Sequence, residues 1–327
     1  MTQRISVALT GAAGQISYAF IFRLLSGQVF GDASIDLRLI DLPHAMPALR
    51  GLAMEIEDCQ FDQLDQLTLT DDLAVGFTGA QWIVCVGSAP RKQGMERQAL
   101  LKVNGTIFVE QGQAIDLYAS DDVKVLVVGN PCNTNALIAM HHAPRIPSNQ
   151  FFAMTMLDQH RAESQLIKKT GIDVTSADCM IFGNHSSTQY PHYNSARING
   201  LPASQFISDQ NWVKDTFVPM IQTRGAEVIK ARGASSAASA ANGIVSSLCL
   251  LNGRTRTDRY SMVVCSNGAY GSPEGLMVSL PCMTDQHGHV SVVEGIDMSE
   301  YDRKQIQVSY DELQVEYNMV KELGLIA

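Results

Sequence analysis

The first half of the chain alternates short apolar runs with stretches whose apolar residues repeat at helical spacing. The apolar runs predict strands over Arg4–Leu9, Ile35–Ile40, Leu67–Thr70, Trp82–Val86 and Val123–Val128. The stretches between them predict helices over Tyr18–Leu25, Ala45–Asp58 and Glu96–Tyr118. Strands that alternate with helices are typical of a doubly wound parallel sheet, which binds ligands beyond the carboxyl ends of its strands.

The regular alternation fades beyond about Phe151, so we expect a second domain there. Small residues from Ala231 to Ala241 predict a helix that another backbone or a ligand approaches closely, with a linker as the alternative. Ser309 and Glu312 have the spacing of a capping box, which predicts a final helix over Tyr310–Leu323. Apolar runs separated by Gly and Asn turns predict an antiparallel meander, with strands at Ser261–Cys265, Leu276–Leu280 and Val290–Val293.

Composition favours a large core and argues against several classes of partner. A length of 327 residues fits two domains, which we place at residues 1–155 and 156–327. The net charge of −9, without a block of Lys and Arg, argues against binding to nucleic acid or to an anionic membrane surface. The seven cysteines are scattered without a C-x-x-C pair, which indicates reduced thiols and no zinc site. His287 and His289 predict a polar hairpin tip more than a metal site. Without a signal segment or a long apolar stretch, we expect a soluble cytoplasmic protein.

A glycine-rich turn, Thr10-Gly11-Ala12-Ala13-Gly14-Gln15-Ile16, follows the first predicted strand and leads into a helix. Glycines let the backbone approach a pyrophosphate, and a helix N-terminus offers free N–H groups to it. Asp41, at the end of the second strand, would accept hydrogen bonds from a ribose diol and repel a 2′-phosphate. A tight turn is the alternative for the glycines alone, but their place in a β-α-β unit favours NAD as cofactor.

Two polar loops fall at the ends of later predicted strands. The loop from Gly87 to Arg97 carries Arg91, Lys92 and Arg97, and its two arginines, six apart, could close over an anion. Taken alone, the loop is as typical of a solvated basic loop. In the loop from Val128 to Asn133, the amide of Asn130 could bridge a substrate hydroxyl and a nicotinamide, with a turn before proline as the alternative.

Asp158, Arg161 and His185 form a third group of candidate residues. Asp158 and Arg161 are three apart, so in a helix they project from neighbouring positions. Asp158 could orient the imidazole of His185, and Arg161 could grip a substrate carboxylate with two parallel hydrogen bonds. Alone, these residues are more typical of a helix-starting Asp, a surface Arg and a loop His.

Together, these motifs resemble the NAD-dependent malate dehydrogenases of the cytosolic type, within the lactate/malate dehydrogenase superfamily. The resemblance runs nearly end to end and is carried by several motifs in order: Thr10–Ile16, Ala89–Arg97, Val128–Pro131, Leu157–Arg161, Gly183–Ser187 and Arg232–Ser236. It implies a doubly wound parallel (Rossmann) NAD-binding domain, followed by an α+β catalytic domain with antiparallel strands. One departure is Met156, where related chains often carry Arg; we expect it to affect packing or an interface and not the chemistry.

The resemblance also implies a role for each site residue. His185 would take the proton of the malate hydroxyl, and Asp158 would hold its tautomer. Arg161 would clamp the C1 carboxylate, Arg91 would bind the second carboxylate with Arg97 assisting, and Asn130 would contact the substrate oxygen. The peptide between Asn130 and Pro131 is expected to be cis. The expected cofactor contacts are Gly11, Ala12, Ala13, Gly14, Gln15, Ile16, Ser17, Asp41, Asn104, Gln111, Val128, Gly129 and Asn130.

The expected reaction is therefore the reversible oxidation of (S)-malate to oxaloacetate. The resemblance also implies that the enzyme is a homodimer and acts in the tricarboxylic acid cycle. Arg91 distinguishes this substrate, because lactate enzymes face a neutral methyl group where a dicarboxylate needs a second cation. The alternatives are a lactate-type dehydrogenase of another 2-hydroxy acid and a non-catalytic NAD-binding sensor. A short-chain dehydrogenase would need Tyr-x-x-x-Lys near mid-chain, and the chain has that spacing only at Tyr317 and Lys321.

Overall fold

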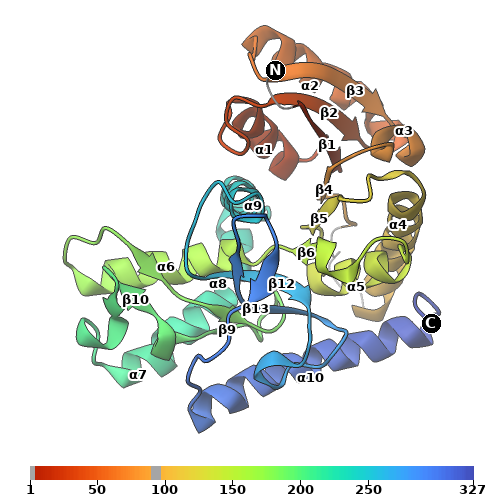
Figure 1. Cartoon of the computed structure of the whole chain (residues 1–327). Coiled ribbons are helices and arrows are strands. Elements are labelled where there is room, and N and C mark those ends of the chain that lie inside the picture. Colours follow the sequence, from red (N-terminus) through yellow and green to blue (C-terminus); the bar gives the residue numbers. More distant parts are fainter. Residues whose placement is uncertain (1–3, 90–96) are drawn as a thin grey trace.

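The computed structural model describes residues 4–89 and 97–327, apart from the side chain of Arg97, and builds them around a nine-stranded sheet (Figure 1). Neighbouring strands are parallel from β3 through β2, β1, β4 and β5 to β6, and antiparallel from β6 through β12 and β13 to β14. The strands are β1 (Arg4–Thr10), β2 (Ser34–Ile40), β3 (Leu64–Thr70), β4 (Trp82–Cys85), β5 (Lys124–Val127), β6 (Phe151–Ala153), β12 (Tyr260–Cys265), β13 (Met277–Thr284) and β14 (Val290–Val292).

Helices flank this sheet, and short strand pairs extend the C-terminal half. The helices are α1 (Gln15–Leu25), α2 (Met46–Cys59), α3 (Leu73–Phe77), α4 (Arg97–Tyr118), α5 (Cys132–His141), α6 (Met156–Thr170), α7 (Gln210–Trp212), α8 (Val218–Arg232), α9 (Ala238–Leu251) and α10 (Glu300–Glu322). The short strands are β7 (Ala177–Asp178), β8 (Ile181–Phe182), β9 (Tyr190–Pro191), β10 (Arg197–Ile198) and β11 (Leu201–Pro202). A π-helical turn, Val213–Phe217, leads into α8.

The core explains why the parallel strands read as continuous apolar runs. All four residues of β4 are buried, as are Val125, Leu126 and Val127 of β5. A parallel sheet whose two faces are covered by helices leaves no solvent side for polar residues. On the helical layers, α4 packs against α3 and α5, and α1 packs against α9.

The predicted fold class is confirmed: a doubly wound sheet is followed by antiparallel strands. The two halves meet through β6, which pairs in parallel with β5 and in antiparallel with β12 at Val263. The meander thus continues the N-terminal sheet. Strand β6 was not predicted, because three apolar residues are too short a run to stand out. In the described ranges, 4–89 and 97–327, no helix is both long and apolar enough to cross a membrane.

Two predictions about the C-terminal half were wrong. The final helix begins at Glu300, where Ser299 and Asp302 form the capping box, so Ser309 and Glu312 lie inside the helix. The segment from Ala231 to Ala241 is not one helix: α8 ends at Arg232, Gly233 follows with φ 73°, and α9 begins at Ala238. The close approach comes later, at Gly243, where a Cβ would lie 2.7 Å from Met154 Sδ.

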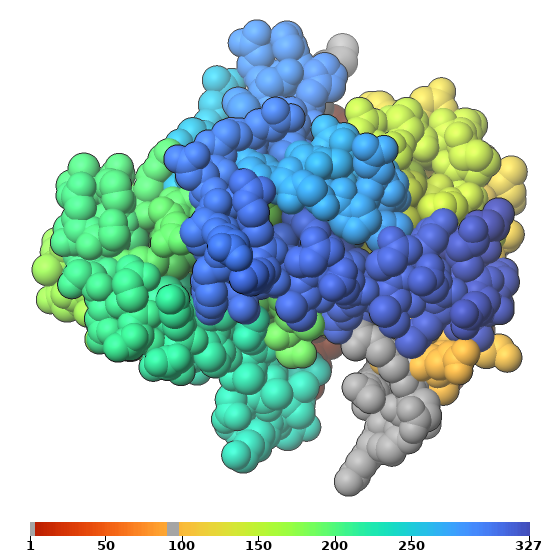
Figure 2. Space-filling model, turned by 90° about the horizontal axis from the view of Figure 1, so that it is seen from below, coloured from red at the N-terminus to blue at the C-terminus, as the bar shows by residue number. Residues whose placement is uncertain are grey.

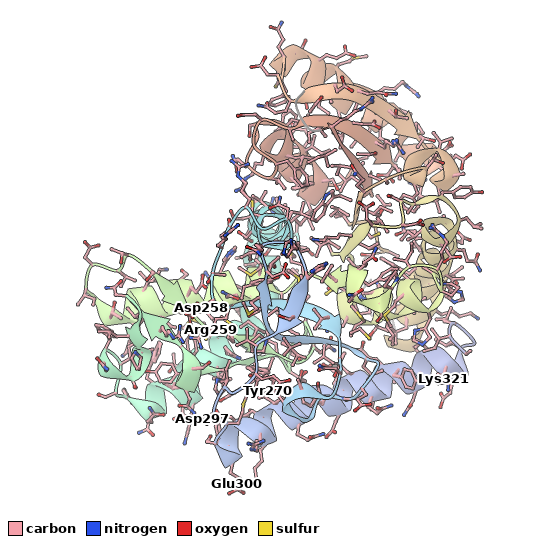
Figure 3. All side chains as sticks on the ribbon, in the orientation of Figure 1. Asp258, Arg259, Tyr270, Asp297, Glu300 and Lys321 are labelled. Atoms are coloured by element: carbon pink, nitrogen blue, oxygen red, sulfur yellow. The ribbon has the colours of Figure 1, made fainter. Side chains whose placement is uncertain are left out.

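Helix α10 lies along one edge of the molecule and connects its two halves. It packs against α4 and α5 of the N-terminal half and against β9 of the C-terminal half. Figure 3 labels Glu300 and Lys321 near its two ends. Seen from below, α10 crosses the face of the molecule (Figure 2). The helix is therefore placed to contact elements from both halves at once.

Candidate active site

The glycine-rich turn lies between β1 and α1, beside the end of β4. Gly11 has φ 64°, and a Cβ there would lie 2.5 Å from Gly87 Cα, so this position needs glycine. Ser17 Oγ donates to the Gly11 carbonyl at 2.8 Å, which closes the turn. Within the described residues, no side chain caps α1 at Gly14. Its first N–H groups therefore remain available to an anion, which fits the pyrophosphate of NAD.

Asp41 lies against this turn, as the sequence predicted from its place after β2. Its Oδ2 accepts a hydrogen bond from Ala13 N at 2.8 Å, and its Oδ1 accepts one from Leu42 N at 2.8 Å. The carboxylate is partly exposed. Asp41 is thus joined to the glycine-rich turn, in which Ala12 and Ser17 are fully buried. The individual contacts of the turn and of Asp41 with NAD stay predictions.

Asn104 and Asn130 join the ends of β4 and β5. Asn104 is fully buried: its Oδ1 accepts from Ala89 N at 2.7 Å, and its Nδ2 donates to the Asn130 carbonyl at 3.1 Å. Asn130 is exposed at the strand tip, and its peptide bond to Pro131 is cis, as predicted. Gly129 N donates to the Cys85 carbonyl at 3.0 Å. The loop that would meet the nicotinamide is therefore fixed from both sides.

Gln111 lies farther along α4 and is 5% exposed. Its Oε1 has no hydrogen-bond partner among the described residues. Arg91 lies outside the described residues, as does the side chain of Arg97. The three predictions stay untested.

Asp158, Arg161 and His185 come together, although His185 lies well beyond the helix that carries the other two. Asp158 is in the first turn of α6 and is fully buried. Its Oδ1 accepts from Arg161 Nη1 at 3.0 Å, and its Oδ2 lies in short contact with His185 Nδ1. The side chains of Arg161 and His185 are each only 13% exposed, so the pair operates in a largely water-excluded place.

The carboxylate form of Asp158 is favoured. Burial raises the pKa of Asp158, but the charge of His185, its hydrogen bond and Arg161 outweigh burial and hold the pKa below its ordinary value. Because a carboxylate only accepts hydrogen bonds, His185 Nδ1 carries the proton in this contact. The other ring nitrogen, Nε2, is then the acceptor of the neutral imidazole and can take a proton from a substrate hydroxyl.

Two further residues hold this pair, and sequence reasoning did not assign them. Gln189 is 3% exposed, and with its amide nitrogen turned toward Asp158 it donates at 3.1 Å and 3.2 Å. Asn133 Oδ1 accepts from His185 N at 3.0 Å. An isolated Gln or Asn carries no signal of such a role in the sequence; its proximity to a buried carboxylate or to the His185 backbone appears only in the fold.

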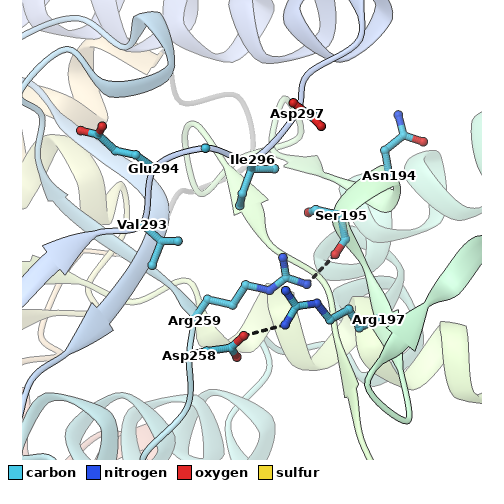
Figure 4. Close-up of a pocket in the computed structure, with 10 residues that line it drawn as sticks. Asn194, Ser195, Arg197, Asp258, Arg259, Val293, Glu294, Ile296 and Asp297 are labelled. Carbon is cyan, nitrogen blue, oxygen red and sulfur yellow. Dashed lines mark hydrogen bonds and ion pairs between the residues drawn. The ribbon is translucent and has the colours of Figure 1, made fainter.

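A cavity of about 310 Å³ lies elsewhere, between the segment after β14 and the residues around β10 (Figure 4). Arg197 pairs there with Asp258 at 2.6 Å, and Arg259 donates to the Ser195 carbonyl. The cavity shares no residue with the predicted catalytic group. Among the residues that the structure describes, no cluster of His, Cys, Asp and Glu is suited to a metal ion.

Comparison with known families identifies the chain. Residues 5–152 match the lactate/malate dehydrogenase NAD binding domain, and residues 155–323 match the lactate/malate dehydrogenase alpha/beta C-terminal domain. The chain belongs to the lactate/malate dehydrogenase family. It is therefore an NAD-dependent dehydrogenase that acts on a CH–OH group, as predicted.

Solved structures of this family are similar to the chain over nearly its full length. A malate dehydrogenase from Naegleria fowleri is 38% identical, with a TM-score of 0.94 and 99% of each chain covered. A lactate dehydrogenase from Trichomonas vaginalis, in complex with NADH and oxamate, is 32% identical, with a TM-score of 0.92 and 98% of each chain covered. A malate dehydrogenase from Plasmodium falciparum, at 23% identity, shares the fold with a TM-score of 0.83 over 98% of this chain and 99% of its own. Because malate and lactate enzymes both match, the choice of substrate needs its own argument.

Proposed function

We propose that this family member is a malate dehydrogenase that interconverts (S)-malate and oxaloacetate. The observation that carries the chemistry is the buried group of Asp158, Arg161 and His185. It combines a proton acceptor with a cation for a carboxylate. A 2-hydroxy acid presents these two groups, a hydroxyl and a carboxylate, on adjacent carbons.

Each side chain has one task in this proposal. Bound NAD would supply the acceptor for the hydride that leaves the substrate carbon. His185 removes the hydroxyl proton through Nε2, while Asp158 holds Nδ1–H and stabilises the imidazolium. Arg161 donates through Nη1 to Asp158 and through Nη2 to Ser236 Oγ at 3.3 Å. A guanidinium has five N–H donors, so Arg161 keeps donors for the C1 carboxylate.

The choice of malate over lactate rests on Arg91. Oxaloacetate and malate carry a second carboxylate, which a cation in the loop from Gly87 to Arg97 would neutralise. With pyruvate or lactate, the cation would face a methyl group and lose its partner, a mismatch of about 1 to 3 kcal/mol against the wrong substrate.

The first test is NADH consumption with oxaloacetate, pyruvate and 2-oxoglutarate in parallel, repeated with NADPH. We expect a strong preference for oxaloacetate and NADH, from the charges of Arg91 and Asp41 respectively. Higher activity with pyruvate would support the catalytic roles of His185 and Asp158 but contradict the assignment of malate as substrate. No activity with any of the three would favour the non-catalytic sensor.

A second test isolates Arg91. Arg91→Gln should shift the ratio of kcat/KM for oxaloacetate over pyruvate toward pyruvate by about 10- to 100-fold, because it removes one carboxylate partner. Lys92→Gln removes the same charge from the neighbouring position and serves as the control. An unchanged ratio in Arg91→Gln would assign specificity to another residue.

Further expectations come from the sequence and from the resemblance. We propose a homodimer that acts in the cytoplasm, in the tricarboxylic acid cycle. The lactate-type alternative stays open to the substrate comparison above. The short-chain dehydrogenase alternative is excluded by the family to which the chain belongs.

A further inference from the structure

Helix α10 presents a polar stripe to the interior where an apolar one is usual. Ser309, Glu312 and Glu316 are spaced three and four apart and so lie on one face of the helix. Ser309 is fully buried and Glu316 is 1% exposed. Burying carboxylates is costly unless hydrogen-bond donors meet them. The donors identify what this stripe holds.

Glu312 holds the loop that carries His185. Its Oε2 accepts from Asn184 Nδ2 at 2.9 Å and from Thr188 Oγ1 at 2.6 Å. Ser186 Oγ also donates to it in a short contact. Asn184 and Ser186 are the two chain neighbours of His185. One carboxylate therefore holds the side chains of the residues on both sides of the catalytic imidazole.

Ser309 and Glu316 complete the attachment on the side before His185. Ser309 Oγ accepts from Asn184 N at 2.8 Å, and Glu316 Oε1 accepts from Asn184 Nδ2 at 3.0 Å. Gly183, with φ 91°, backs directly onto Ser309, where a Cβ would collide with the hydroxyl. The helix and the loop thus meet without a gap.

The polar stripe of α10 also contacts the start of α5, which holds the backbone of His185. Thr134 Oγ1 donates to Glu316 in a short contact. Its neighbour Asn133 accepts from His185 N and donates to the Gly183 carbonyl at 3.3 Å. The loop is therefore held between α10 and the N-terminus of α5.

Two residues of the segment from Asn184 to Gln189 contact the buried Asp158. His185 contacts it through Nδ1, and Gln189, which follows Thr188, donates to it through its amide. Movement of the segment from Asn184 to Gln189 would displace His185 and Gln189, two of the three partners of Asp158. A displacement of about 1 Å at such a site can lower turnover by about 100-fold.

We propose that Glu312 is a positioning residue for the His185–Asp158 pair, acting from α10 through the hydrogen bonds of Asn184, Ser186 and Thr188. The proposal deepens the proposed function and rests on the catalytic role of His185. The charge matters because all three donors converge on one carboxylate oxygen, Oε2. The amide oxygen of a glutamine in this place is neutral and has two lone pairs for three donors, and its nitrogen accepts no hydrogen bond.

Glu312→Gln is the direct test. We expect kcat to fall by about 10- to 100-fold, with KM for the 2-oxo acid changed by less than about 3-fold, because alignment is lost while the carboxylate clamp remains. NADH binding, measured by fluorescence titration, should be unchanged. Glu322→Gln removes the same charge from an exposed position of the same helix and should leave all three quantities unchanged.

A milder substitution distinguishes loss of alignment from loss of folding. Thr188→Val removes one of the three donors and keeps the β-branched shape. We expect a smaller fall in kcat than in Glu312→Gln, again with little change in KM. Thermal unfolding of each variant establishes that the enzyme compared is folded.

A spectroscopic measurement tests the proposal without turnover. The Nδ1–H proton of His185, shared with Asp158, should give a far-downfield proton NMR signal that His185→Asn removes. Glu312→Gln should broaden or shift that signal, and Glu322→Gln should not. A wild-type signal together with wild-type kcat in Glu312→Gln would overturn the positioning role. If wild-type protein turns over none of the three oxo acids, the proposed function fails, while the NMR comparison still decides whether Glu312 holds the pair.

Discussion

At the residue scale, the site depends on burial that converts ordinary polar groups into a defined pair. Asp158 is fully buried, and its carboxylate accepts hydrogen bonds from Arg161, His185 and Gln189. In water such contacts would be weak, but in a dry site each one orients its partner. The imidazole can therefore exchange a proton with substrate while its other nitrogen stays fixed.

His185→Asn tests this role directly. Asparagine can keep a hydrogen bond to Asp158 but has no group that takes a proton near neutral pH. We expect NADH binding to be retained and kcat to fall by at least about 100-fold, because general base catalysis is removed. Stopped-flow binding and steady-state turnover on the same preparation provide the measurement. Near-normal turnover would place the base at another residue.

The sequence could predict part of this site and not the rest, for a physical reason. Asp158, Arg161 and His185 are residue types that act chemically, and the fold brings them together as the motifs indicated. Gln189 and Glu312 act only by holding other residues, so their types carry no signal until their neighbours are known. Glu312 did attract attention in the sequence, as a capping residue, and that assignment was wrong.

At the element scale, the start of α10 shows how a capping pattern misleads. Ser309 and Glu312 have the right spacing, but so do Ser299 and Asp302 almost three helical turns earlier, and these two form the cap. Asp302 is buried and also accepts from Tyr190 Oη at 2.6 Å and Asn194 Nδ2 at 2.8 Å. The side chains of Ser309 and Glu312 instead accept hydrogen bonds from Asn184, so they do not cap the start of a helix. Similarly, Gly233 interrupts a segment whose small residues predicted one helix.

Ser299→Ala tests the true cap. Ser299 Oγ accepts from Asp302 N at 3.2 Å, and the loss of that bond should lower the free energy of unfolding by about 1 kcal/mol. Urea denaturation measures the change, with the exposed Ser164→Ala on α6 as the control. No difference between the two variants would mean that the contacts of Asp302 with Tyr190 and Asn194 fix the helix start without Ser299.

At the scale of the whole molecule, one sheet and one helix unite the two halves. The sheet passes through β6 from parallel to antiparallel pairing, and α10 packs on elements of both halves. The alternation of strands and helices predicted β1 to β5 and helices α1, α2 and α4 of the first half, but not α3, α5 or β6. The joining of the meander to that sheet depends on three residues of β6, which no local pattern announces.

The stability of the whole protein should respond to pH through Glu163 on α6. Burial raises the pKa of Glu163 from its ordinary 4.5 to about 7; the hydrogen bond from Gln159 lowers it by less, and Asp178 adds to the rise. The folded state therefore binds this proton more tightly than the unfolded state. Protonated Glu163 thus contributes to the free energy of unfolding at acid pH, and this contribution is lost as pH rises from about 4.5 to about 7. The loss amounts to about 1 to 3 kcal/mol.

Glu163→Gln should abolish this dependence, because an amide accepts the same hydrogen bond from Gln159 without a charge to bury. The stability of Glu163→Gln relative to wild type should therefore rise by about 1 to 3 kcal/mol between about pH 5.5 and about pH 8, measured by urea denaturation.

Two other buried carboxylates do not titrate in this pH range. The pKa values of Asp158 and Asp302 are lowered, so the stability that these two contribute is lost only at more acid pH. Glu322→Gln, exposed on α10, should show the same difference from wild type at both pH values. If Glu163→Gln behaves in the same way as Glu322→Gln, Glu163 does not titrate in this range, and the polar contacts around α6 hold its charge in the folded protein.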